Sequence, residues 1–454
     1  MLISALVGSV FVIIALSLKR GGRAVITGAV IVPQFYVTAP SLGALWGVAL
    51  LVAWVSEATT DREANGISRR YQVGIGIALG AGLCSLVALL WSPSGNTGIM
   101  LASQSILVAT LLRDLAAPGG SRDREITRAV SIAGLWIAAA AACTIVFRMN
   151  GAVEELYLRS SPARVLIGPE VDGLFSFARN NVLDPVKSGG LFYVNANMNS
   201  MFLGAGAFVL FATWRLTRAR RLLIFAILAY AAVFFTGSKT GLVLSCATAG
   251  VWSVLVMSRR RGLGPLGIPL LIASPVLSLA IFDATRTLLP SFYGMSEASA
   301  ESRAFLWREA GQLLMDKPLL GLGFGGWQAH VELEWGIQLP PHNWIIASWA
   351  NGGIALALFN CALAAWALWA TGAATVRAIT PIARQRMAAV FCAVMWVVVH
   401  GFFDNTMVYG EVHTVLLFVA AVAFALDGMV ERASEEGSVR GVHPCTAKRN
   451  RTYA

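Results

Sequence analysis

The sequence predicts an all-α, polytopic integral membrane protein with about 12 or 13 transmembrane helices. Hydrophobic residues make up 57% of the 454 positions, charged residues make up only 13%, and the mean hydropathy is +0.68. Too few polar side chains remain to cover a water-facing surface, so lipid is the main solvent of this chain. The apolar residues also fall in continuous segments, several of which approach the roughly 20 residues that a membrane-spanning helix needs.

The apolar segments define the elements in chain order. They fall at residues 2–18, 24–39, 41–56, 72–91, 98–112, 129–147, 198–214, 222–236, 240–257, 264–282, 342–370, 387–402 and 412–426. The first is expected to be a retained helix, because no basic segment precedes it and no clear small-residue cleavage site follows it. The predicted regions are N-terminal helices over 1–147, a first extracytoplasmic loop over 148–197, central helices over 198–282, a second extracytoplasmic loop over 283–341, C-terminal helices over 342–430 and a basic cytoplasmic tail over 431–454.

The basic residues predict the orientation of these helices. Most of the 35 lysines and arginines lie in alternate connections, beginning with the one that holds Lys19 and Arg20, and the positive-inside bias assigns that side to the cytoplasm. The net charge of +11 is therefore explained by topology and by anionic lipid headgroups, and no nucleic-acid partner is expected. Both long loops, and the turn at Lys239, then lie on the outer face.

The second long loop contains several candidate functional residues. Residues 297–315 predict a short amphipathic helix that can lie on the membrane surface, aim Arg303 inward and stop before Pro318; Trp307 and Arg308 lie on the same helix. A flexible turn with Gly321 and Gly323 is expected next. This turn formally matches the glycine fingerprint of dinucleotide sites, but no strand precedes it, so nucleotide binding is not expected.

A histidine follows this turn at the start of a long apolar helix. Pro341 and Asn343 flank His342, and a histidine in the first turn of a helix feels the positive end of the helix dipole. This environment favours the neutral imidazole, which can accept a proton. His342, Arg303 and Lys239 are thus expected to meet at the outer membrane face.

These residues together resemble the O-antigen ligase and polymerase superfamily of bacterial membrane glycosyltransferases. The resemblance rests on the turn Thr236–Gly241, Arg303 with Trp307, Pro318 with Gly321 and Gly323, His342-Asn343 followed by Gly352-Gly353, and Asn195, Asn197 and Ser200 at the entry to a helix. It implies glycan transfer from a polyprenyl-pyrophosphate carrier to the hydroxyl of a glycan or of a lipid- or wall-linked acceptor. The reaction is expected at the outer face of a bacterial cytoplasmic membrane, without metal or other cofactor.

The resemblance also implies roles for individual residues. His342 takes the position of the loop histidine that activates or orients the acceptor, Arg303 that of an arginine holding the pyrophosphate, and Lys239 that of a second cation. This chain has lysine where the family tends to have arginine, and lysine lacks the guanidinium fork. Possible accessory residues are Arg308, Asn343, Trp307, Asp404 and Asn197.

Several alternatives remain open from the sequence. Ligation and polymerisation share the donor chemistry, so either fits, and a solute permease or a non-catalytic envelope assembly factor are the other classes considered. Against a permease, the apolar segments hold almost no ionisable residue near their centres. His400 and His413, which flank the last outer loop with Asp404 and Glu411, fit either acceptor binding or helix capping.

Overall fold

The computed structural model is helical, with no strand in the part of the chain that it describes, which confirms the predicted all-α class. The described residues are 2–38, 41–60, 68–116, 122–172, 174, 187–257, 290–336, 339–404, 407 and 410–427. Within them, eight helices are long and apolar enough to cross a membrane, and two shorter apolar helices lie at Ile3–Ser17 and Val415–Asp427. The expected helix at 264–282 and the expected tail at 431–454 lie outside the described residues.

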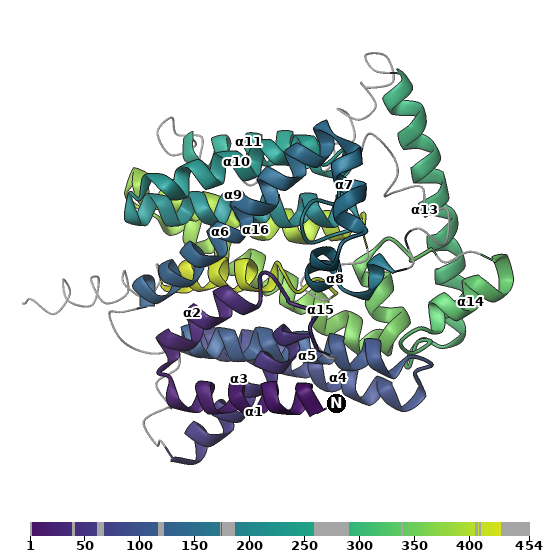
Figure 1. Ribbon diagram of the computed structural model, residues 1–454, viewed down its shortest axis with the longest axis horizontal. Helices are drawn as coiled ribbons and strands as arrows, with labels where there is room; N and C mark the ends of the chain where they lie inside the picture. The colour runs from purple at the N-terminus through teal and green to yellow at the C-terminus, as the bar shows by residue number, and fades with distance from the viewer. Residues whose placement is uncertain are drawn as a thin grey trace, which may run out of the picture.

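The N-terminal third forms one side of a helical bundle. Its helices are α1 (Leu2–Ser17), α2 (Arg20–Val30), α3 (Leu42–Thr60), α4 (Arg69–Ala88), α5 (Gly95–Leu115) and α6 (Arg122–Met149). Helix α1 packs on α3, α3 and α4 pack on α5, and α2 packs on α6. In Figure 1 most of these helices run roughly parallel to one another, as expected for a bundle that crosses a bilayer.

Helix α2 is shorter than the apolar pattern predicts. The expected segment at 24–39 is helical only to Val30, and the chain then turns, with Gln34 in the left-handed region at a φ of 51°. Pro33 cannot supply a backbone donor to a continuing helix. The chain from this turn instead packs on the first long loop, where the backbone N–H of Tyr36 donates to the carbonyl of Val165 at 2.7 Å. The expectation of a complete span here is wrong.

The C-terminal part completes the bundle. Its helices are α9 (Ala196–Thr217), α10 (Arg220–Phe235), α11 (Lys239–Met257), α15 (Trp344–Arg377) and α16 (Pro381–Gly401). Helix α9 packs on α10 and α16, and α15 joins the two sides by packing on both α4 and α16. The helix Val415–Asp427 is buried within the bundle, since every residue from 415 to 426 is at most 2% exposed. Its apolar residues on all faces explain this position.

The two long loops contain helices of their own. The first has α7 (Gly151–Leu158) and α8 (Ser161–Ile167), and the second has the long helix α13 (Pro290–Asp316) and the shorter α14 (Gly326–Trp335). All four gather at one end of the bundle, at the right in Figure 1, where α13 runs across the ends of the other helices. Helix α13 ends before Pro318, as predicted, and its buried stripe Leu306, Ala310 and Leu314 packs against α14. These elements cover the end of the bundle where the candidate residues lie.

Candidate functional site

His342 lies in a strained backbone position directly before α15. Its φ is 48°, one of three positive values among the described non-glycine residues. The next residue, Asn343, is the N-cap of α15, and its side-chain oxygen accepts from the backbone N–H groups of Ile345 at 2.9 Å and Ile346 at 3.3 Å. Strain of this kind persists only where neighbouring contacts hold it. The cap thus fixes the direction in which the side chain of His342 extends from the backbone.

Two further contacts hold this corner from the other elements. The indole of Trp307 on α13 donates to the carbonyl of Pro341 at 2.7 Å, and the amide of Asn343 donates to the carbonyl of Phe402 at 3.5 Å. Phe402 follows α16, and its ring also contacts that of Trp344. Trp307 and Asn343, both predicted as accessory residues, therefore connect His342 to α13 and to the end of α16.

Burial and one nearby cation make His342 less basic. Burial and the nearby guanidinium of Arg303 lower the pKa of His342 from 6.5 to about 4. Burial also lowers the pKa of Arg303, and the carboxylate of Asp404 opposes that shift. Arginine nevertheless stays protonated in proteins. The site therefore presents a neutral imidazole, as predicted for His342, beside a fixed cation. The carboxylate of Asp404 lies within electrostatic range of that cation.

A chain of polar contacts connects the Lys239 turn to the end of α16. The hydroxyl of Ser238 donates to the side-chain oxygen of Asn197 at 2.7 Å, and that of Ser200, one turn along α9, lies 2.8 Å from Nε2 of His400. His400 is fully buried and close enough to Arg303 to feel its charge. Asn197 and the turn directly before Lys239 are thus connected along α9 to His400, which lies within electrostatic range of Arg303.

The glycine turn is held rigidly against a break in α15, where a flexible turn was expected. Gly352 and Gly353 leave the helical conformation, with Gly353 at a φ of 74° and a ψ of −176°. The freed carbonyl of Ala350 accepts from the backbone N–H of Leu322 at 2.7 Å, and that of Pro318 accepts from Ile354 at 3.1 Å. A Cβ at Gly353 would overlap the carbonyl of Leu319. The turn with Gly321 and Gly323 and the Gly352-Gly353 break in α15 therefore pack directly against each other.

The remaining predicted residues have simpler surroundings. Arg308 is exposed on α13. Glu411 is buried and accepts from the backbone N–H groups of His413 at 3.0 Å and Thr414 at 2.7 Å, so it caps the last helix. His413 is buried among Phe192, Tyr193 and Phe202. For Glu411, helix capping is the alternative that the geometry favours.

Sequence reasoning underestimated His400. Its position near the end of an apolar segment suggested a capping or headgroup-level residue. The structure instead buries it against Ser200, which comes from another helix. The only sequence indication was that Asn197 and Ser200 are three residues apart, and so lie on one face of α9.

A comparison with protein families decides the family of this region. Residues 224–361 match the family model described as O-antigen ligase. This region is similar to O-antigen ligases, and we call residues 224–361 the O-antigen ligase domain. The predicted resemblance to the O-antigen ligase and polymerase superfamily is therefore confirmed, and the chain is a multi-pass membrane protein. No curated protein matches the chain.

The O-antigen ligase domain includes most of the constellation. Lys239, Arg303, Trp307, His342 and Asn343 all lie within the matched residues. Asn197, His400 and Asp404 lie outside them and reach the domain only through the packing of α9 and α16. The match supports glycan transfer of the O-antigen ligase or polymerase kind in general.

Proposed function

We propose that the protein transfers a glycan from a polyprenyl-pyrophosphate carrier to an acceptor hydroxyl at the outer face of a bacterial cytoplasmic membrane. The observation that carries this proposal is the neutral imidazole of His342 beside the Arg303 guanidinium within an O-antigen ligase domain. The acceptor oxygen attacks the anomeric carbon, its proton passes to His342, and the bond from that carbon to the pyrophosphate oxygen breaks. A lipid-linked donor also fits a site at the end of a membrane bundle, because its tail can remain in the bilayer.

Donor binding itself is expected to increase the basicity of His342. A pKa of about 4 makes the imidazole a weak base near neutral pH, because an effective general base has a pKa close to the working pH. Arg303 is one cause of the low value. A bound pyrophosphate would neutralise Arg303 and add negative charge, which favours the imidazolium. Proton acceptance is thereby coupled to the presence of the donor.

The leaving pyrophosphate gains negative charge as the glycosidic bond breaks. Fixed cations that face the developing charge stabilise this transition state. We assign this role to Arg303 and Lys239, which come from different elements. The contact between Ser238 and Asn197 supports the assignment of Lys239, since it holds the turn that carries the lysine against α9. Asp404 is assigned to orienting Arg303, whose positive charge its carboxylate stabilises.

Replacing Lys239 tests its proposed role as the second cation that binds the pyrophosphate. We expect Lys239→Arg to retain or increase transfer, because guanidinium binds phosphate through a two-pronged contact that lysine lacks. Lys239→Gln should raise the KM for the donor and lower kcat, since it removes the charge. Initial rates over a range of donor concentrations measure both effects. Equal activity of the arginine and glutamine variants would contradict this role.

The pH dependence of transfer tests the environment of His342. Protonated His342 cannot accept a proton, so kcat/KM should fall only as the pH approaches about 4, the pKa in the free protein. The acid limb of kcat should lie at higher pH, because bound pyrophosphate raises that pKa. Arg303→Gln removes one cause of the low value and should move the limb of kcat/KM toward 6.5. Identical limbs in wild type and Arg303→Gln would contradict the coupling.

Product analysis tests the reaction itself. Purified protein would be given a polyprenyl-pyrophosphate-linked oligosaccharide and candidate acceptors in the presence of EDTA, and the products separated by gel electrophoresis. A ladder of repeats would identify a polymerase, and a single shifted acceptor band a ligase. If no glycan is transferred while vesicles containing the protein take up solute, the proposal is wrong and a permease is supported.

A further inference from the structure

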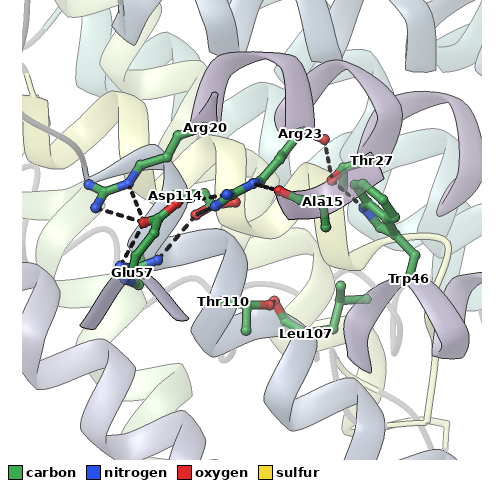
Figure 2. Close-up of polar contacts among 10 residues, drawn as sticks. Ala15, Arg20, Arg23, Thr27, Trp46, Glu57, Leu107, Thr110 and Asp114 are labelled. Carbon is green, nitrogen blue, oxygen red and sulfur yellow. Dashed lines mark hydrogen bonds and ion pairs between the residues drawn. The ribbon is translucent and has the colours of Figure 1, made fainter. Parts of the chain in front are cut away.

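A cluster of five ionisable residues lies outside the O-antigen ligase domain, where α2, α3 and α5 meet (Figure 2). Glu57 on α3 contacts three guanidinium groups, those of Arg23 at 2.7 Å, Arg113 at 2.9 Å and Arg20 at 3.0 Å. The carboxylate of Asp114 lies 3.6 Å from Arg23 and 3.8 Å from Arg113. We name these five residues the arginine cluster. Nothing in the proposed transfer reaction uses it.

The arginine cluster carries more positive than negative charge. Three guanidinium groups face two carboxylates, which leaves one positive charge without a counter-ion inside the cluster. The side chains of Arg23 and Arg113 are only 3% and 2% exposed, and their Nη1 atoms have no hydrogen-bond partner within the described part of the chain. A buried charge that is incompletely paired is destabilising. An additional anion would relieve this imbalance.

Contacts other than the carboxylates hold the arginines in place. Nε of Arg23 donates to the carbonyl of Ala15 on α1 at 2.6 Å, and the guanidinium of Arg113 lies 5.3 Å from the ring centre of Trp54. Helix α2 starts at Arg20 without a side-chain cap and without an acidic residue in its first turn. The positive end of its dipole therefore adds to the same field. The positive charge is preorganised and does not depend on the two acids alone.

The arginine cluster opens to the surface on one side and lies far from the His342 site. Arg20 and Glu57 form its edge, with side chains 18% and 25% exposed. The start of α5 contacts the glycine turn, where Ser94 donates to the carbonyl of Phe324 at 2.9 Å. Arg113 follows 18 residues after Gly95, which at 1.5 Å per residue is roughly 27 Å along α5. That distance is close to the thickness of a bilayer core, which is about 30 Å.

We propose that the arginine cluster binds a phosphate-bearing anion, and that Arg20 presents the surplus charge to it. Guanidinium groups match phosphate oxygens in geometry and keep their charge. At the far end of α5, the source that fits is an anionic phospholipid headgroup of the leaflet opposite to the transfer site. Free phosphate shares the chemistry, so the test includes both sources. Because this inference does not depend on glycan transfer, its failure would leave the proposed function intact.

Thermal unfolding of the full-length protein in detergent tests this proposal. Phosphatidylglycerol should raise the midpoint of wild-type protein at concentrations where phosphatidylcholine has little effect. Arg20→Gln removes the surplus charge, while the ion pairs of Glu57 with Arg23 and Arg113 remain. The phosphatidylglycerol concentration that gives half of the midpoint shift should then increase about tenfold. Each midpoint shift is measured relative to the same variant without lipid, so a change in basal stability does not affect the result.

The matched control is Lys19→Gln, which removes one exposed positive charge from the residue next to Arg20. It should respond to phosphatidylglycerol as wild type does. If inorganic phosphate reproduces an Arg20-dependent shift, the anion is free phosphate. Equal responses of Arg20→Gln and Lys19→Gln, or no selective response of wild type, would overturn the proposal. Should Arg20→Gln fail to fold, Arg20→Lys keeps the charge without the fork and should bind with intermediate affinity.

Discussion

Replacing His342 by alanine is expected to reduce glycan transfer by a factor on the order of 10² to 10⁴, the usual contribution of a general base. The protein should remain folded, because the imidazole lies before α15 and the cap of that helix comes from Asn343. The donor KM should change little, since the cations that hold the pyrophosphate are still present. Single-turnover transfer with purified protein, together with the thermal unfolding midpoint, measures both effects.

His342→Asn is the matched control for the backbone. The φ of 48° at this position is strained for alanine, whereas asparagine adopts the left-handed region more readily. Asparagine hydrogen-bonds an acceptor hydroxyl but cannot take its proton at these pH values. If His342 acts as a base, both variants lose transfer to a similar degree. Substantial activity in the asparagine variant would instead assign His342 to orienting the acceptor.

Replacing Gly353 by alanine is expected to destabilise the protein by about 3 kcal/mol or more. The backbone there lies in a region that only glycine adopts readily, and a Cβ would meet the carbonyl of Leu319. Relief would require the chain from Pro318 to Leu322 to move away from the break in α15. Because this segment follows α13 directly and packs against α15, Arg303 and His342 would lose their relative positions. Transfer and the unfolding midpoint should therefore fall together.

Gly250→Ala provides the control for this substitution. Gly250 lies within α11, and a Cβ there would meet open space. Alanine is favoured over glycine inside a helix, so this variant should be as stable as wild type or slightly more so. A normal unfolding midpoint for Gly353→Ala in detergent would show that the two glycine motifs do not form the packing contact described above.

Local sequence determined a large part of this protein. Composition alone indicated a membrane protein, because apolar side chains at this density have no other stable environment. Pro318 marked the end of α13, and Pro341 with Asn343 marked the start of α15, since proline and a capping residue act through their own backbone neighbours. The neutral state of His342 was likewise predicted from its place near a helix start, although the causes that the structure shows for its low pKa are burial and Arg303.

Tertiary structure decided the remaining features of the fold and the site, because these features depend on contacts between residues far apart in the chain. Asp404 lies about 100 residues from Arg303, and His400 lies 200 residues from Ser200, so no local pattern joins them. The chain that follows the early end of α2 packs against the first long loop, and hydropathy does not encode that contact. The arginine cluster joins residues of three helices, and only the packing of these helices converts separate charges into one buried site. The physical reason is the same in each case: periodicity and capping act over a few residues, whereas burial and electrostatic pairing are set by whichever helices meet.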